Sequence, residues 1–320
     1  MSNTPHHYQS IKILGLDEAD KQRLRVAVAT RLRLNGILKK KSRHLLTNKL
    51  IAFLESPESH ASSELFNWLL AYGTPALITD MIHHTSSFTS AQQADLDVMR
   101  HHGIERLLPR DHISPDLQLW QSNDKPQNAL ICFTGNARKL NIPVQLFHCS
   151  VARHFDLIIY LRDPSQRLFT QGIPGLAKDI NGLGNYLRSQ VPQDCQTSIV
   201  GTSGGGYAAL AVAEQLNAHR TALFSPPLNY QGTKIIGQHK GVPIQHVRLY
   251  FARQNLRDVN WANDWKNTEY RHAVRWLQTD SHGTLAYLYR SGNFDHCLSW
   301  LRADKSPPRL LRYLDKILQR

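Results

Sequence analysis

The chain has 320 residues, of which 41% are hydrophobic, 8% aromatic and 20% charged, so it can bury a core and is not intrinsically disordered. Every apolar run is broken by polar or charged residues before it reaches the roughly 18–20 residues of a membrane-spanning helix, so no membrane span is expected. The formal net charge of +13 favours an acidic partner, but no nucleic-acid recognition motif accompanies it, so nucleic-acid binding is not expected.

The first 120 residues differ from the rest in glycine content and periodicity. They hold few of the 18 glycines, and their apolar residues recur at helical spacing, such as Leu65 and Leu69. We predict a mostly helical N-terminal region over residues 1–120 and a second domain over residues 121–320. The polar, proline-bearing segment 115–128 has the composition of a connection. The helical region offers a surface on which a partner protein could dock.

Two features of the sequence bear on the cellular compartment. The N-terminal residues lack the charged start, apolar middle and small-residue cleavage site of a secretory signal. The cysteines are widely spaced and form no CxxC pair, so neither a zinc site nor a disulfide framework is indicated. We therefore expect a cytoplasmic protein with reduced thiols.

The second domain alternates short apolar runs with helical patterns. This alternation is typical of a parallel sheet that helices cover on both faces. The runs predicted to be strands are Ala129–Phe133, Phe155–Leu161, Thr197–Val200, Thr221–Phe224, Val247–Ala252 and Val274–Gln278. An amphipathic helix over Pro307–Arg320 is expected to end the chain.

The most specific motif is the strand that continues through Gly201-Thr202-Ser203-Gly204-Gly205 into a helix. Gly-x-Ser-x-Gly between a strand and a helix is the nucleophile elbow, in which the serine has a strained backbone and the glycines prevent collisions. A serine at a helix N-terminus also lies beside backbone N–H groups that stabilise an anion. Neither the dinucleotide fingerprint nor the Gly-Lys-Ser/Thr of a phosphate-binding loop is present, which favours a catalytic Ser203.

With this elbow the sequence resembles the α/β-hydrolase superfamily, and the resemblance covers about residues 127–302. It implies an α/β fold with a mostly parallel sheet covered by helices. It also implies catalytic residues in the order Ser, acid, His, with the acid after a late strand and the histidine after the last strand. Asp258 follows the fifth predicted strand and is the expected acid, with Asp264 as the alternative. His282 follows the sixth and is the expected base, with His296 as the alternative.

The resemblance further implies an oxyanion hole made by two backbone N–H groups. One belongs to the residue after the nucleophile, Gly204. The other is expected in the loop after the first predicted strand, where Asn136 follows a glycine, although the HGGG motif of many lipases is absent. Basic residues after the first two strands, among them Arg162 and Arg167, would suit an anionic substrate.

These residue types together indicate acyl transfer. Serine needs a histidine to take its proton, and the histidine needs a carboxylate to fix its tautomer. We therefore predict a serine hydrolase that cleaves a carboxylic ester or thioester of a small or acylated substrate through Ser203, His282 and Asp258, with no cofactor. No metal site is expected, because the chain has no HExxH spacing. The alternatives are an acyltransferase on the same triad and a non-catalytic α/β-hydrolase-like component of a secretion or surface-polysaccharide pathway.

Overall fold

The computed structural model describes only part of the chain, and the predicted helix over 307–320 and the helical patterns before residue 90 lie outside that part. The described residues are 90–102, 116–136, 139–230, 233–234, 243 and 246–302. The chain divides into two compact units, which are residues 1–115 with 143–150 and residues 116–142 with 151–320. In the first unit the structure describes helix α6 (Ser90–His102) and most of helix α7 (Val144–Val151).

The second unit is built around a seven-stranded sheet with the strand order β1-β3-β2-β4-β5-β8-β9. The strands are β1 (Leu117–Gln121), β2 (Asn128–Phe133), β3 (Leu157–Leu161), β4 (Gln196–Thr202), β5 (Arg220–Phe224), β8 (Val247–Ala252) and β9 (Val274–Leu277). All neighbours are parallel except β1, which is antiparallel to β3. The six predicted strands are therefore confirmed, as β2, β3, β4, β5, β8 and β9.

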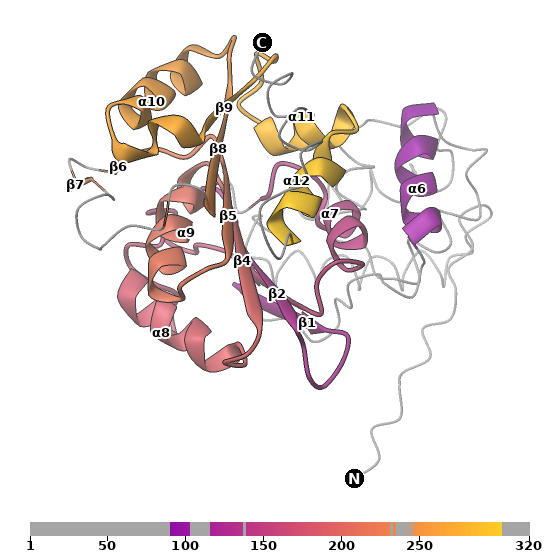
Figure 1. Ribbon diagram of the computed structural model, residues 1–320, viewed down its shortest axis with the longest axis vertical. Helices are drawn as coiled ribbons and strands as arrows, with labels where there is room; N and C mark the ends of the chain where they lie inside the picture. Colours follow the sequence, from indigo (N-terminus) through magenta and orange to yellow (C-terminus); the bar gives the residue numbers. More distant parts are fainter. Residues whose placement is uncertain are drawn as a thin grey trace, which may run out of the picture. The chain divides into compact units, whose positions relative to one another are not determined.

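Helices cover both faces of this sheet, as Figure 1 shows. On one side lie α8 (Ile180–Gln190), α9 (Gly204–Gln215) and α10 (Leu256–Lys266), and on the other lie α11 (Thr284–Arg290) and α12 (Phe294–Arg302). A 3₁₀ helix, η4 (Glu269–Ala273), precedes β9, and a short hairpin of β6 (Asn229–Tyr230) and β7 (Thr233–Lys234) follows β5. None of the described helices is long and apolar enough to cross a membrane.

The central strands are mostly apolar because both of their faces are covered. Every residue of β3, β5 and β8 is buried. One large cluster of buried apolar side chains packs around the sheet and includes Phe133, Leu187, Tyr207, Leu249 and Trp265. Strand order, the antiparallel edge strand and the elbow between β4 and α9 give the α/β-hydrolase-like architecture that the sequence predicts.

The prediction of a connection at the start of this unit is wrong. The segment 115–128, predicted as a connection, contains β1, and the unit begins at residue 116. Strand β1 is an edge strand with one hydrogen-bonded neighbour, and its burial is uneven, because Gln118 is buried whereas Leu119 is exposed. Such a strand has no continuous apolar run, so its composition does not distinguish it from a loop.

Candidate active site

Ser203, the predicted nucleophile, lies in the tight turn between β4 and α9. Its backbone has φ 46° and ψ −126°, a left-handed conformation that a non-glycine residue rarely adopts. The turn is held because the N–H of Ser203 donates to the carbonyl oxygen of Phe224 at 2.7 Å, and the N–H of Gly206 donates to that of Ser203 at 2.9 Å. Strain of this kind persists only where the surrounding structure enforces it.

Two glycines of the motif are required by close backbone approach. A Cβ at Gly201 would lie 2.7 Å from the Cβ of Ala209, which is closer than carbon atoms can pack. A Cβ at Gly205 would collide with the carbonyl oxygen of Thr134, in the loop after β2. The glycine pattern therefore reflects the packing of β4 and α9 against their neighbours.

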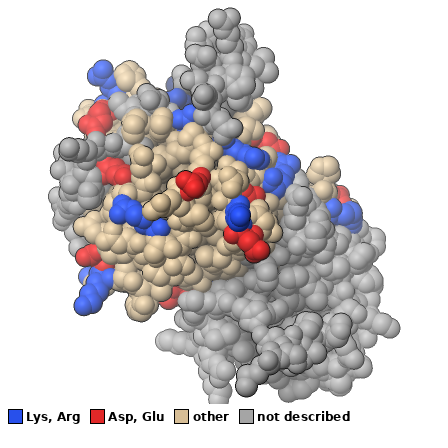
Figure 2. Space-filling view, turned by 60° about the horizontal axis from the view of Figure 1, so that its bottom comes forward, with Lys and Arg blue, Asp and Glu red and all other residues tan. Residues whose placement is uncertain are grey.

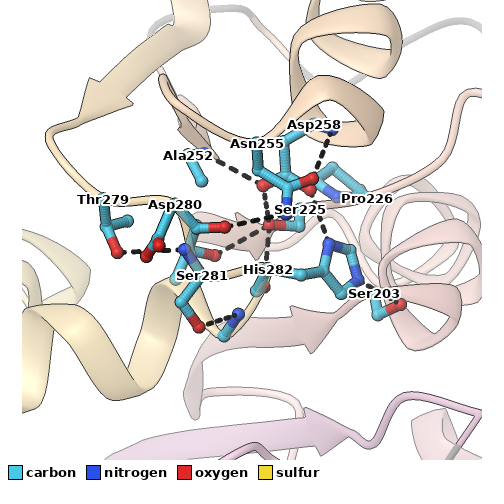
Figure 3. Close-up of polar contacts among 12 residues, drawn as sticks. Ser203, Ser225, Pro226, Ala252, Asn255, Asp258, Thr279, Asp280, Ser281 and His282 are labelled. Carbon is cyan, nitrogen blue, oxygen red and sulfur yellow. Dashed lines mark hydrogen bonds and ion pairs between the residues drawn. The ribbon is translucent and has the colours of Figure 1, made fainter.

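Asp258, from the first turn of α10, and His282, from the loop after β9, lie beside Ser203 (Figure 3). The Nε2 atom of His282 lies 3.0 Å from the Oγ of Ser203. Its Nδ1 atom lies 2.5 Å from the Oδ1 of Asp258. The three side chains thus form one hydrogen-bonded line, although Ser203 and His282 are 79 residues apart in sequence. Because the carboxylate accepts from Nδ1–H, the lone pair of Nε2 faces the serine hydroxyl.

Asp258 is fully buried in the first turn of α10. Asn255 caps this helix, and its side chain accepts a hydrogen bond from the N–H of Asp258. The second carboxylate oxygen, Oδ2, accepts from the N–H of Ala252 at 2.9 Å and from the hydroxyl of Ser225 at 2.6 Å. These donors compensate the loss of water that an ionised carboxylate suffers on burial.

The loop that carries His282 is itself tied down. The side-chain amide of Asn255 donates to the carbonyl oxygen of Asp280 at 2.8 Å, so the residue that caps α10 also holds this loop. The N–H of Ser281 donates to the hydroxyl of Thr279 at 3.1 Å. The ring of Trp261, from α10, meets the His282 ring edge-on with centroids 5.4 Å apart. The position of the imidazole is therefore fixed from several directions.

The two alternatives from the sequence lie elsewhere on the surface of the same unit. Asp264 is exposed in the last turn of α10, and His296 is exposed in α12. Among the described contacts, the line to Ser203 passes through His282 and Asp258. The geometry therefore favours Asp258 over Asp264 as the acid and His282 over His296 as the base.

The loop after β2 lies against the elbow, where the oxyanion hole is predicted. The N–H of Gly135 donates to the hydroxyl of Thr202 at 3.0 Å, and a Cβ at Gly135 would lie 3.2 Å from that of Ser203. The side chain of Asn136 lies close to Gly204, since a Cβ there would meet its amide oxygen. Gly204 is the first residue of α9, so its N–H has no acceptor within the helix. Both predicted donors therefore belong to segments that border Ser203.

A third loop, after β3, adds an apolar side chain to this site. Asp163 is buried, and its carboxylate accepts from the hydroxyl of Ser165 at 2.6 Å and from the N–H of Phe169 at 2.8 Å. This holds Leu168 and Phe169 in left-handed conformations, with φ of 58° and 62°. The Leu168 side chain then lies beside Gly204, where a Cβ would collide with it.

Sequence reasoning did not identify Asp163, Ser225 or Trp261 as part of the site. Ser225 has one usable signal, because it directly follows β5, and polar residues at the carboxyl ends of parallel strands gather at one edge of the sheet. The others acquire their places only through contacts that the fold creates.

The same part of the chain also contains cysteines, which are nucleophiles and metal ligands in other proteins. The cysteines at 132, 149, 195 and 297 are all buried and free. Burial raises the pKa of the Cys195 thiol to about 11, helped by the charge of Asp156, so this thiol is protonated at neutral pH. Within the described residues there is no cluster of three or more His, Cys, Asp or Glu side chains that could hold a metal ion.

Comparisons with known proteins add solved structures of low identity. No protein-family model and no curated protein matches the chain. An α/β serine hydrolase without a lid, from Xanthomonas campestris, is 13% identical over 60% of this chain and 91% of its own, with a TM-score of 0.42. MenH from S. aureus is 12% identical over 58% of this chain and 97% of its own, with a TM-score of 0.37. A thermophilic esterase from Thermogutta terrifontis with butyrate bound is 15% identical over 59% of this chain and 91% of its own, with a TM-score of 0.36.

Identities and TM-scores this low transfer no activity and no residue role. The α/β-hydrolase-like fold is established here by the strand order of residues 116–302, the antiparallel β1 and the elbow at Ser203.

Proposed function

We propose that the protein is a serine hydrolase that cleaves a carboxylic ester or thioester, with Ser203 as nucleophile. The observation that carries this proposal is the unbroken hydrogen-bonded line from Asp258 through His282 to the Ser203 hydroxyl, with distances of 2.5 and 3.0 Å. A serine in a strained turn at a helix N-terminus has no structural need for such partners. A nucleophile does need them.

Each residue has a defined part in the proposed reaction. As the Oγ of Ser203 attacks the substrate carbonyl carbon, the Nε2 of His282 takes its proton. Asp258 keeps the imidazole in the required tautomer and stabilises the imidazolium. The imidazolium then protonates the leaving oxygen or sulfur, which departs and leaves the acyl group on Ser203. A water molecule, deprotonated by the same histidine, releases the acid and restores the enzyme.

The tetrahedral intermediate carries a negative oxygen, which needs donors placed in advance. The backbone N–H groups of Gly204 and Asn136 are proposed for this role, because both segments border Ser203. The N-terminal end of α9 adds a favourable dipole at the same point. Removing one such donor typically costs about 10²–10³ in kcat.

The surroundings favour an acyl group with an apolar part. Leu168 lies at the elbow, and Trp261 lies against the imidazole that faces the leaving group. The neighbouring Arg167 is exposed and supports the expectation of an anionic substrate. On the face shown in Figure 2, Lys and Arg of the described residues are interspersed with Asp and Glu, which suits a small charged substrate better than a nucleic acid. The buried free thiols agree with a reducing, cytoplasmic location.

Pre-steady-state hydrolysis of p-nitrophenyl butyrate tests the proposal. An acyl-enzyme predicts a burst of p-nitrophenolate of about one equivalent per chain whenever deacylation is slower than acylation. Ser203→Ala should abolish both burst and turnover. Ser198→Ala is the matched control and should retain both; Ser198 is a buried serine of β4 whose hydroxyl donates to the carbonyl oxygen of Leu301. Turnover that persists in Ser203→Ala would refute the proposal.

A further inference from the structure

Ser225 lies at the centre of the hydrogen bonds around Asp258, yet no step of the proposed reaction uses it (Figure 3). It directly follows β5 and is fully buried. Its Oγ lies 2.6 Å from the Oδ2 of Asp258 and 3.0 Å from the hydroxyl of Thr284. It also lies 3.2 Å from the carbonyl oxygen of His282. One hydroxyl thus contacts the carboxylate, the histidine loop and the start of α11.

The distances and charges assign the protons in this cluster. A serine hydroxyl has one proton to donate and can accept from other donors. The shortest contact leads to an ionised acceptor, and hydrogen bonds to charged groups are the shorter and stronger ones, so Ser225 donates to Asp258. Thr284 then donates to Ser225. The resulting chain, Thr284 to Ser225 to Asp258, approaches the carboxylate opposite His282, and bonds in such a chain reinforce one another.

The backbone of Ser225 indicates that its side chain is needed. Its φ is 50°, in the left-handed region where glycine is the unstrained residue. Its N–H donates to the carbonyl oxygen of Tyr250 at 2.8 Å, which fixes the residue between β5 and β8. A glycine here would make the same backbone bond without strain, whereas only a side chain supplies the hydroxyl.

We propose that Ser225 is a positioning residue for the acid. Together with the N–H of Ala252 it holds Oδ2 of Asp258, so that Oδ1 faces the Nδ1 of His282. A carboxylate turns about its bond to Cβ, and donors on both oxygens restrict that rotation. This inference rests on the proposed function, because it assumes that His282 and Asp258 act as a pair on Ser203.

The test compares Ser225→Gly with Ser198→Ala, a buried hydroxyl deletion outside the site. The readouts are kcat and KM for p-nitrophenyl butyrate, the rate of labelling by a fluorophosphonate, and the melting temperature. Ser225→Gly should lower kcat and the labelling rate by about 10- to 100-fold, as expected for a hydrogen bond to a charged group. KM should stay within about twofold. The melting temperature should fall no further than that of Ser198→Ala, because the relief of backbone strain by glycine offsets part of the lost hydrogen bond. Ser225→Ala makes the same comparison where the glycine variant does not fold.

A double-mutant cycle with Thr284→Val tests the assigned direction of donation. The valine keeps the shape of the buried threonine and removes its hydroxyl. The hydrogen bond from Ser225 to Asp258 is then weaker, so kcat should fall by about two- to fivefold. The double variant Ser225→Gly/Thr284→Val should be no slower than Ser225→Gly alone.

Two results would overturn the inference. If Ser225→Gly reacts as fast as the unmodified protein, the hydroxyl has no part in positioning Asp258. If the fold-loss of kcat in the double variant equals the product of the fold-losses in the two single variants, Thr284 does not act through Ser225. In both cases the unmodified protein is still labelled, so the proposed function survives. Failure of the unmodified protein to be labelled would overturn both.

Discussion

Replacing Asp258 by asparagine should convert the histidine into the wrong tautomer. Oδ2 accepts from the backbone N–H of Ala252, a donor that cannot change role, so the amide oxygen of the asparagine must take that position. The amide nitrogen then replaces Oδ1 and donates to the Nδ1 of His282, which becomes an acceptor. The ring proton moves to Nε2 and faces Ser203, and the base is lost.

The expected loss of kcat is large because a histidine in the wrong tautomer cannot take the proton of Ser203. A wrong tautomer at an otherwise intact triad lowers kcat by about 10⁴-fold, which corresponds to about 5 kcal/mol of transition-state stabilisation. The fold should survive, since the amide fills the same volume and keeps the bonds to Ala252 and Ser225. Circular dichroism and the melting temperature check this independently of activity.

The assay is kcat/KM for p-nitrophenyl butyrate, with Asp264→Asn as the matched control. Asp264 is exposed on the same helix, so its variant should remain within about twofold of the unmodified protein. Asp258→Asn with activity within tenfold of the unmodified protein would refute the tautomer reasoning. A loss confined to Asp264→Asn would make that residue the acid.

Three further changes test the packing and the titrating groups. Gly205→Ala should destabilise the fold by about 1–3 kcal/mol and abolish fluorophosphonate labelling of Ser203, because the added Cβ would meet the carbonyl oxygen of Thr134. Thermal melting and the labelling rate check this. A fully active variant would contradict the close approach of Gly205 to Thr134. The pKa of His246 is lowered below its ordinary 6.5 by burial and then by the charges of Arg220 and a neighbouring histidine. The unfolded chain therefore binds the proton more readily than the folded one. The stability that is present above pH 6.5 is lost as the pH falls. The urea midpoint should therefore fall less between pH 7 and pH 5 in His246→Gln than in the unmodified protein. An equal fall in both proteins would show that His246 does not cause the loss of stability. Iodoacetamide should leave the native protein active and Cys195 unmodified, since its thiol is buried and protonated, whereas rapid modification would show that the core opens.

The central sheet could be predicted from the sequence because its strands are buried on both faces. Strands β3, β5 and β8 are buried along their whole length, and each contains a run of at least three apolar residues, which leaves a signal in the sequence. Edge strand β1 is unevenly buried and includes the exposed Leu119, so its residues carry no such run. Prediction therefore succeeds for the strands whose burial is complete and fails at edge strand β1, whereas the other edge strand, β9, is predicted.

The candidate site divides in the same way. Ser203 stands in a local motif, and the order of Asp258 and His282 after late strands follows from the resemblance. Ser225 has no local pattern, and it reaches Asp258 across 33 residues of sequence through the pairing of β5 with β8. In the sequence Asp163 cannot be told from other aspartates in loops, because only the folded structure shows that it is buried. Residues that position others are fixed by tertiary contacts, which a single sequence does not display.

Fluorophosphonate labelling read by intact mass tests most directly whether Ser203 is an activated nucleophile. The unmodified protein and Ser198→Ala should each gain one adduct, and Ser203→Ala should gain none, with all three shown to be folded by circular dichroism. Peptide mapping should place the adduct on the segment that joins β4 to α9. A folded, unmodified protein that gains no adduct, or a Ser203→Ala variant that gains one, would contradict the account.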